Sequence, residues 1–390
     1  MMSSQVPGEL TGESLRLRTP AGSVPLGFAQ EEGVVYLVAR ERAAQWPVDL
    51  LRNGHGMLTL PEGGVEGTPR LISDRSEQTR VLRLFLQKYG PDRFARWYEH
   101  PARILRVTLN PAPPHQGPGT EHYYEWLQSE FDNVAEDYDR HITGNRMNRL
   151  LRNRSLAWLE PRFARSRRLL EIGCGSGMET LPMLRAGHQV VAVDISERML
   201  STVRSKAERE GLGGQLETRH LRARDLDYLV EDLGTGSIDG AYSTYGALNC
   251  EPDLGPIPVA LRRLLAPGAP FVAGVYNRWC LFEIAGYSAS LQTSRAFGRR
   301  RNPIPVGSSR FCVDVYAHSV ADFERLFRPG FSVERIEGVP VLLPPSDLTG
   351  YAEKFSRHFE RLAGWDAWVG HRWPFNRLGD HFLITLVRAS

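Results

Sequence analysis

Three glycines stand at every second position of LLEIGCGSGMET, which spans residues 169–180. The residues before Gly173 are mostly apolar and predict a buried strand that turns at the glycines into a helix. Gly175 and Gly177 leave the main chain open to close approach, and the free N–H groups at a helix start can bind a ligand. The stretch predicts a site for a nucleotide-like ligand, with a glycine-rich turn that binds nothing as the alternative.

Residues around the glycines distinguish between such ligands. Glu171 precedes the loop, where a carboxylate repels a pyrophosphate and attracts an ammonium group. Met178 occupies the place where a dinucleotide fingerprint would have its third glycine. Asp194 ends the next apolar run and can accept both hydroxyls of a ribose, while Asp225 can accept from an adenine amino group. An amine, a ribose, an adenine and no phosphate together describe S-adenosylmethionine.

Residues 122–390 resemble a class I S-adenosylmethionine-dependent methyltransferase. The resemblance rests on five motifs in order: EIGCGSG, VDIS, RDLD, IDGAYSTYGALN and LLAPGAPFV. It implies a methionine-end site at Glu171, Gly173, Cys174, Gly175 and Gly177, a ribose site at Asp194, and adenine contacts from Ile195, Met199, Asp225 and Leu226. In the lead-in segment FDNVAEDYDRH, the resemblance implies that Tyr138 closes over the methionine part, with a core role as the alternative.

The acceptor site is expected where the fourth and fifth strands end. Methyl transfer from a sulfonium requires alignment of donor and acceptor and exclusion of water, so a general base is optional. The candidate catalytic residues are Tyr245, Asn249, Tyr276 and Arg278. The sequence contains neither NPPY nor DPPY, the motif of amine and nucleobase methyltransferases. We therefore expect O- or C-methylation of a small molecule, such as a metabolite, a natural product or a lipid-like acceptor.

Two segments near this site have open interpretations. Residues 281–318 form an insertion that is expected to cover the acceptor, and its Arg299–Arg301 run is either a solvated face or a contact for an anionic group. Residues 365–381 concentrate tryptophans and histidines and predict a cap or dimer contact, with substrate stacking as the alternative. His220 and His318 are expected to be satisfied surface histidines rather than bases.

The elements that position these residues alternate between strands and helices after residue 122, which predicts an α/β fold with a parallel sheet. The sequence predicts a helical lead-in over 122–163 and a final helix over 319–327, capped by Ser319. Parallel strands are expected at 168–172, 189–194, 215–221, 237–243 and 270–276, and an antiparallel closing pair at 331–339 and 381–388. The fold class is thus a Rossmann-like, seven-stranded domain with a C-terminal antiparallel hairpin.

A different organisation is expected before the Pro/Gly-rich linker at 111–121. Residues 1–110 contain short alternating strands, SLRLRT, SVPLGFA, GVVYLVA, GMLTLP and ILRVTL, and two helices at about 43–52 and 76–97, which predict a small antiparallel barrel. Residues 14–110 resemble the split barrel of the flavin- and deazaflavin-dependent nitroreductase and pyridoxamine-phosphate-oxidase group. That resemblance implies a flavin or deazaflavin, but its phosphate loop is reduced here to Arg18–Gly22. The alternative is a module for homodimerisation or substrate presentation.

The composition of the chain limits the classes of substrate, metal and compartment that we expect. The chain has 390 residues and a net charge of +3, which predicts a small-molecule substrate rather than a nucleic acid. Its four cysteines form no CxxC pair, so we expect no metal site and a reducing compartment. We expect a cytoplasmic protein, because the sequence shows no secretory leader and no apolar run long enough to span a membrane.

Overall fold

The structure is a computed structural model that divides into two compact units. It describes residues 14–19, 22–31, 34–39, 46–53, 56–60, 63–98, 101, 103–109, 119–135, 138–304, 313–345 and 359–390. Unit 1 comprises Met1–Tyr123 with Pro305–Cys312, and unit 2 comprises Tyr124–Ile304 with Val313–Ser390. Most of the predicted linker, and residues 305–312 of the predicted insertion, lie outside the described residues. The predicted domain boundaries stay predictions.

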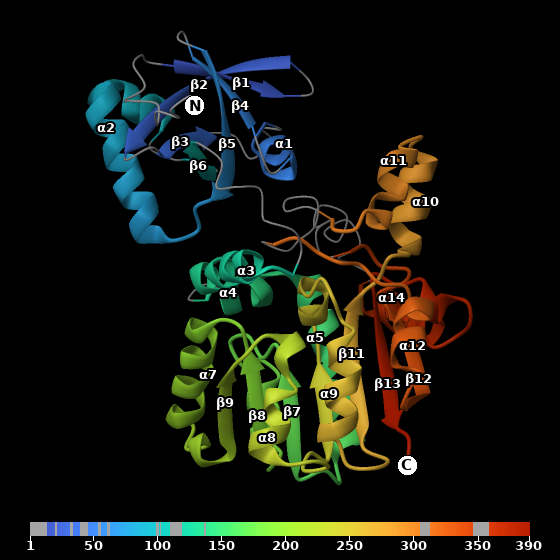
Figure 1. Cartoon of the computed structure of the whole chain (residues 1–390). Coiled ribbons are helices and arrows are strands. Elements are labelled where there is room, and N and C mark those ends of the chain that lie inside the picture. Colours follow the sequence, from blue (N-terminus) through green and yellow to red (C-terminus); the bar gives the residue numbers. More distant parts are fainter. Residues whose placement is uncertain are drawn as a thin grey trace, which may run out of the picture. The chain divides into compact units, whose positions relative to one another are not determined.

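Unit 1 contains a closed antiparallel barrel of six strands in the order β1-β2-β3-β6-β5-β4 (Figure 1). The strands are β1 (Ser14–Thr19), β2 (Gly22–Glu31), β3 (Val34–Ala39), β4 (Gly56–Leu60), β5 (Gly63–Leu71) and β6 (Arg103–Leu109). Two helices accompany them, α1 (Trp46–Asn53) and α2 (Arg75–Trp97), the second kinked at Gly90. The predicted small antiparallel barrel is confirmed, and β5 is a strand that the sequence analysis did not include.

Strand β3 shows how the barrel is packed. Every residue of Val34–Ala39 is buried, and successive side chains point to opposite faces of the strand. Val35 and Leu37 belong to one apolar cluster with residues of β1, β2 and β6, while Tyr36 belongs to a second cluster with Phe85 of α2. The barrel is therefore filled on one side of β3 and covered by α2 on the other.

Unit 2 is built on a seven-stranded sheet in the order β12-β13-β11-β10-β7-β8-β9. Its strands are β7 (Arg168–Ile172), β8 (Gln189–Asp194), β9 (Leu216–His220), β10 (Gly240–Ser243), β11 (Pro270–Tyr276), β12 (Phe331–Val339) and β13 (His381–Arg388). Only β13 runs antiparallel to its neighbours. The predicted Rossmann-like sheet with an antiparallel C-terminal pair is confirmed. The strand order reverses beside β7, and the carboxyl ends of parallel strands at such a point form a crevice for ligands.

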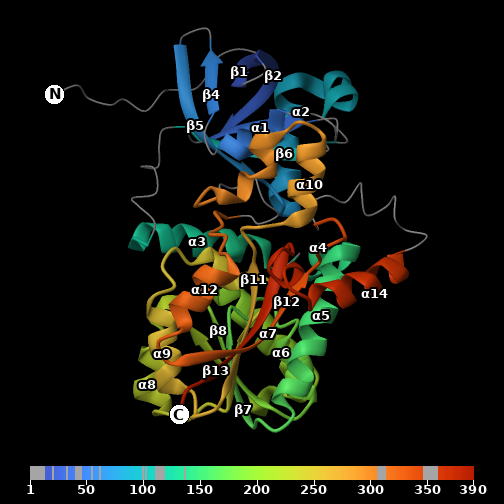
Figure 2. The same cartoon turned by 90° about the vertical axis from the view of Figure 1, so that its right-hand side faces the viewer.

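Helices cover both faces of this sheet (Figure 2). The α-helices are α3 (Glu121–Val134), α4 (Tyr138–Gly144), α5 (Arg146–Phe163), α6 (Thr180–Arg185), α7 (Glu197–Arg209), α8 (Tyr228–Leu233), α9 (Pro256–Leu264), α10 (Leu281–Ala289), α11 (Thr293–Ala296), α12 (Val320–Phe327) and α14 (Phe359–Gly370). Short 3-10 turns are η1 (Gly213–Gln215), η2 (Ala223–Asp225), η3 (Ala247–Cys250), η4 (Gly298–Arg300) and η6 (Phe375–Arg377). One apolar cluster joins the sheet to α8, α9 and α12, and a second joins it to α5, α6 and α7. The two clusters anchor the strands whose carboxyl ends carry the candidate site.

Candidate active site at the carboxyl edge of the sheet

The glycine loop follows β7 with three residues of positive φ: Gly173 at 74°, Gly175 at 51° and Gly177 at 85°. These values suit glycine because L side chains rarely adopt them. A Cβ on Gly173 would lie 2.4 Å from Cβ of Ala247, and one on Gly177 would lie 2.3 Å from Cγ2 of Val203. The fold itself therefore requires glycine at positions 173 and 177, because a side chain there would clash with Ala247 or Val203.

Asp194 is held against this loop from the end of β8. Its Oδ2 accepts from the N–H of Gly175 at 2.8 Å, and its Oδ1 accepts from the N–H of Ser196 at 2.9 Å. Burial raises the pKa of this carboxyl to about 6, although these backbone hydrogen bonds favour the ionised form. Each carboxylate oxygen can accept a further hydrogen bond. The side chain is thus oriented, and can bind a pair of hydroxyl groups beside Gly175.

Glu171 lies beneath the loop at the end of β7, with only 2% of its surface exposed. Its carboxyl accepts from the Thr180 hydroxyl at 2.5 Å and from the Tyr242 hydroxyl at 3.0 Å. Burial raises its pKa to about 8, which favours the protonated form of the carboxyl. An ammonium placed nearby would favour the carboxylate. A cationic ligand bound nearby would therefore lower the pKa of Glu171 and favour release of its proton.

Tyr138 opens α4 and faces the glycine loop. A Cβ on Gly175 would lie 3.7 Å from Cε1 of Tyr138, which is ordinary van der Waals contact. The next residue, Asp139, accepts from the Ser176 hydroxyl and pairs with the Lys206 ammonium. These contacts hold the start of α4 on the loop, and the closing of Tyr138 over a ligand stays a prediction.

The remaining predicted cofactor residues lie nearby in different surroundings. Met199 is 1% exposed and Leu226 is completely buried in the apolar core, so the Leu226 side chain serves packing. Ile195 follows Asp194 and is half-buried, and its carbonyl oxygen lies 2.7 Å from Nε2 of His220. Asp225 ends η2 and lies 3.7 Å from the Arg222 guanidinium. Burial raises the pKa of the Cys174 thiol, which disfavours the reactive thiolate.

An ion pair that the sequence analysis missed lies between the loop and the acceptor candidates. Nη1 of Arg152 on α5 is 2.6 Å from both carboxylate oxygens of Glu179, and both residues are buried. The Arg152 guanidinium also lies 4.6 Å from the ring centroid of Tyr245, which follows β10 with a φ of 59°. A positive φ is uncommon for a bulky residue and directs attention to function. Glu179, two positions after Gly177, was the local signal for this pair.

Two of the candidate acceptor-site residues, Asn249 and Arg278, have side chains that form hydrogen bonds within the protein. The amide nitrogen of Asn249 donates to the carbonyl oxygens of Tyr276 and Tyr316 at 3.1 and 2.7 Å, and its Oδ1 accepts from the N–H of Tyr276 at 2.7 Å. The Arg278 guanidinium pairs with Asp322 at 2.8 Å and donates to the carbonyl oxygen of Ala317. Asn249 thus braces Tyr276, and Arg278 holds the start of α12.

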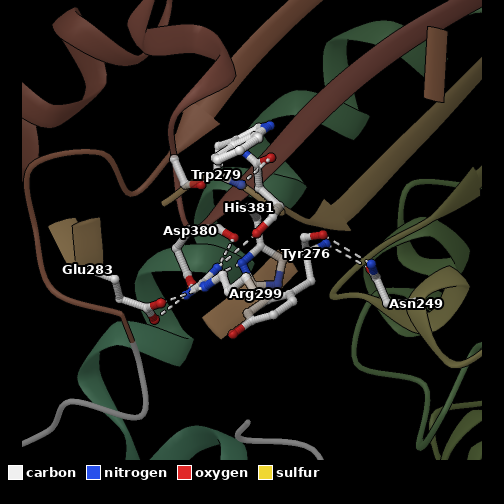
Figure 3. Close-up of polar contacts among 9 residues, drawn as sticks. Asn249, Tyr276, Trp279, Glu283, Arg299, Asp380 and His381 are labelled. Atoms are coloured by element: carbon white, nitrogen blue, oxygen red, sulfur yellow. Dashed lines mark hydrogen bonds and ion pairs between the residues drawn. The ribbon is translucent and has the colours of Figure 1, made fainter. Parts of the chain in front are cut away.

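The Arg299–Arg301 run divides between the interior and the surface. Arg300 and Arg301 are exposed, whereas Arg299 is 5% exposed. Arg299 donates to Glu283 at 2.5 and 2.8 Å and to Oδ1 of Asp380 at 2.6 Å (Figure 3). The interpretation as a solvated face is therefore wrong for Arg299, which is a counter-ion to buried carboxylates, and a contact with an anionic substrate or lipid headgroup stays a prediction.

His381, the first residue of β13, extends this cluster and was treated in the sequence analysis only as part of a cap. Its Nδ1 lies 3.0 Å from Oδ2 of Asp380, and its ring stacks on Tyr245 with centroids 6.4 Å apart. It also pairs in the sheet with Tyr276, whose ring meets it edge-on at 5.3 Å. The local signal was an Asp-His pair at the start of a strand.

The side chains of Cys280, Glu283 and Asp380 also form a grouping that could hold a metal ion, with ligand atoms within 4.8 Å of one another. Arg299 donates to both carboxylates in that place. Because the guanidinium already supplies the positive charge, the geometry describes an ion-pair cluster. The prediction that the protein has no metal site stays a prediction.

The strand order, the glycine loop and the acid at the end of β8 define a class I S-adenosylmethionine-dependent methyltransferase domain. Residues 169–268 match the family model described as a methyltransferase domain. The chain therefore contains the domain of an enzyme of this class. Within the described part of the chain, every helix is too short or too polar to serve as a membrane span.

Curated relatives match part of the chain. The ubiquinone biosynthesis O-methyltransferase of Caulobacter sp. (strain K31) is 36% identical over 111 residues, which are 28% of this chain and 41% of the relative. The phosphatidylethanolamine N-methyltransferase of Cereibacter sphaeroides is 33% identical over 110 residues, 27% of this chain and 52% of the relative. The tRNA 5-carboxymethoxyuridine methyltransferase of Escherichia coli (strain K12) is 30% identical over 103 residues, 25% and 38% respectively. The chain thus spans about half or less of these relatives.

Solved structures also align with the chain. The 1,6-didemethyltoxoflavin-N1-methyltransferase of Burkholderia thailandensis has a TM-score of 0.44 and 19% identity, covering 72% of this chain and 95% of its own. A methyltransferase of Mesorhizobium loti has a TM-score of 0.41 and 21% identity, covering 60% and 96%.

Proposed function

We propose that this protein transfers the methyl group of S-adenosylmethionine to an oxygen or carbon atom of a small-molecule acceptor. The observation that carries the proposal is the bond between the N–H of Gly175 and Asp194, which places an oriented carboxylate beside the glycine loop where the strand order reverses. A carboxylate in that place suits a ribose that bears no phosphate.

The charges around the loop fit this cofactor. Lys206 is paired with Asp139, and Arg152 is paired with Glu179, so the nearby cations that the structure describes are already compensated. Glu171 adds a carboxyl that an ammonium would ionise. A ligand with a pyrophosphate would find little positive charge here, whereas an amino acid joined to a ribose finds suitable partners.

Each residue then has a proposed role. Asp194 accepts hydrogen bonds from the ribose hydroxyls and orients the ribose. The Glu171 carboxylate pairs with the ammonium group of the methionine part. Tyr138 closes over the methionine part and excludes water. When bound, the cofactor supplies a sulfonium methyl group, and the protein aligns it with an acceptor near Tyr245 and Tyr276.

The class of acceptor is the part of the proposal that most needs a test. The relatives named above include an O-methyltransferase of ubiquinone biosynthesis and a methyltransferase of tRNA 5-carboxymethoxyuridine. The missing NPPY or DPPY motif and the balanced net charge of +3 support a small molecule. We would incubate the full chain and methyl-labelled S-adenosylmethionine with a cell extract divided into RNA, protein and low-mass fractions. After chromatography separates unreacted S-adenosylmethionine, label in a new low-mass compound is expected, and label confined to RNA would contradict the proposal.

A further inference from the structure

Two buried side chains on one face of α5 have polar atoms that lack a hydrogen-bond partner. We propose that Asn148 and Arg152 form a subsite that binds a neutral hydroxyl group of the methyl acceptor. Arg152 lies beside Tyr245, which follows β10 where the acceptor is expected. The inference rests on the proposed function and names the polar group by which its acceptor is recognised.

The two atoms without a partner are Oδ1 of Asn148 and Nε of Arg152, and both are shielded from solvent. Asn148 is 4% exposed and Arg152 is 7% exposed. A buried polar atom without a partner is unfavourable, and native structures rarely contain one unless a ligand or a water molecule satisfies it. Two such atoms on neighbouring side chains therefore indicate a place where a ligand binds.

The pair differs from other residues that have an atom of this kind. Nε also lacks a partner in four further arginines, which are half-buried: Arg106, Arg162, Arg219 and Arg388. In the part of the chain that the structure describes, Asn148 and Arg152 are the only residues with such an atom that are buried as a whole. The two stand on the same helix, four positions apart.

The helix places both side chains on one face. Residues four positions apart have Cβ atoms about 5–6 Å apart, so Asn148 lies one turn nearer than Arg152 to the start of α5. Only Asn145 separates α5 from α4, whose first residue, Tyr138, borders the glycine loop. At the other end, the Arg152 guanidinium lies 4.6 Å from the ring centroid of Tyr245. The face that carries the pair therefore extends from Tyr245 toward α4.

The charge of Arg152 is already compensated. Its Nη1 lies 2.6 Å from both carboxylate oxygens of Glu179, which is also buried. Burial opposes the charged guanidinium, whereas Glu179, Tyr138 and Tyr245 favour it, and the pKa of Arg152 is raised overall. A charged acceptor group placed here would have no counter-ion, because the ion pair is neutral. The subsite therefore suits an uncharged group.

The two atoms differ in their hydrogen-bonding capacity. Nε of Arg152 carries a hydrogen and can only donate, whereas Oδ1 of Asn148 can only accept. A hydroxyl oxygen can accept from the first and donate its own hydrogen to the second. An ether or a ketone can only accept. Among neutral groups that bind through one oxygen atom, a hydroxyl is thus the complementary one.

The test compares two alcohols with their methyl ethers: phenol with anisole, and cyclohexanol with methoxycyclohexane. NMR titration of the full chain, saturated with S-adenosylhomocysteine, gives the four affinities. We expect each alcohol to bind about tenfold or more tightly than its ether, because the ether cannot donate to Asn148. In Asn148→Leu this preference should fall below about threefold. A preference that is absent in wild type, or unchanged in Asn148→Leu, would overturn the inference.

A second variant addresses the donor. Arg152→Lys keeps a positive charge beside Glu179 and has no N–H at the position of Nε. We expect it to weaken alcohols and ethers alike by about tenfold, since both accept from Nε. The control is Ser237→Ala, which removes another side-chain oxygen without a partner, before the amino end of β10 and thus at the opposite edge of the sheet. It should leave all four affinities unchanged.

Thermal unfolding separates binding from a structural role of Asn148. Asn148→Leu replaces an unsatisfied amide by an apolar side chain of similar size. Without ligand, the variant should therefore unfold at the same temperature as wild type or at a higher one. A lower unfolding temperature would show that the amide stabilises the fold, and it would overturn the inference.

Calorimetric binding of S-adenosylhomocysteine separates this inference from the proposed function. Failure of wild type to bind S-adenosylhomocysteine would refute the proposed function itself. Normal binding in wild type and in both variants, without the preference for alcohols, would refute only the subsite.

Discussion

The two units differ in what they bury. In the described part of unit 1, the buried side chains are apolar or aromatic, as in the β3 contacts with α2. Unit 2 also buries ionisable groups, namely Arg152, Glu171, Glu179, His188, Asp194, Glu251, Glu283, Arg299, Glu337, Asp366, Asp380 and His381. Buried charge is unfavourable unless paired, and buried ionisable groups are frequent at sites of chemistry. Among these groups, Glu171, Asp194 and His381 lie at the carboxyl edge of the parallel strands, near the ends of β7 and β8 and at the start of β13. The comparison indicates that catalysis belongs to unit 2.

The barrel of unit 1 carries predictions about its cofactor and its assembly that experiments can test. The reduced loop Arg18–Gly22 includes positions 20 and 21, which lie outside the described residues. Binding of a flavin or deazaflavin, the split-barrel type and homodimerisation stay predictions. Absorbance near 450 nm in the purified protein tests the flavin, and its mass in solution tests the dimer.

The largest effect is expected from Arg299→Leu, which leaves two buried carboxylates without their counter-ion. We expect unit 2 to lose about 3–5 kcal/mol of unfolding free energy. Urea denaturation followed by hydrogen exchange at β11 and β13 measures this loss. Arg301→Leu, which removes an exposed arginine from the same run, should change stability by less than about 0.5 kcal/mol. If both variants lost similar unfolding free energy, the buried charge cluster would not be a particular source of stability in unit 2.

A second effect concerns pH. The folded-state pKa of Glu171 is raised from 4.5 to about 8, so protonation favours the folded state. This contribution is fully present below the unfolded value of 4.5 and is lost as pH rises through about 8. Glu171→Gln, which stays neutral, should therefore gain stability over wild type as pH rises from about 5 to about 9. Thermal unfolding across that range measures the difference.

Exposed Glu160→Gln serves as the control for the pH experiment. If it alters the pH dependence as much as Glu171→Gln does, the buried carboxyl is not the source.

The smallest effect is expected in the barrel. Ile104 is 2% exposed in an apolar cluster, so Ile104→Val should cost about 1 kcal/mol through lost packing alone. Since the described barrel core holds no buried charge, affinity for S-adenosylhomocysteine should not change. A tenfold loss of affinity in this variant would show that the barrel contributes to the cofactor site.

Much of the fold could be predicted because its signals are local. Apolar runs such as Arg168–Ile172 and Pro270–Tyr276 coincide with the strands observed. Strand β5, Gly63–Leu71, was missed because its glycines and proline are typical of turns. Its pairing with β4 and β6 comes from tertiary contacts that no local pattern reports.

Site residues that lie next to a sequence motif could be predicted. Those brought together from distant parts of the chain could not. Asp194 could be placed because it ends a strand beside the loop. Arg299 could not, because its partners Glu283 and Asp380 are 16 and 81 positions away, and its own neighbours are exposed. Long-range ion pairs leave no periodic pattern in a sequence, so a buried arginine resembles a solvated one.

Calorimetric titration of the full chain with S-adenosylhomocysteine tests the central claim most directly. Asp194→Asn is compared with Asp239→Asn, whose carboxylate also accepts from main-chain N–H groups, those of Arg167 and Arg168 at 2.8 Å, but at the start of β7, the end of the strand opposite the glycine loop. We predict one site per chain, weakened about tenfold or more by Asp194→Asn and unchanged by Asp239→Asn. Absence of binding to wild type, or equal weakening by the two substitutions, would contradict the account.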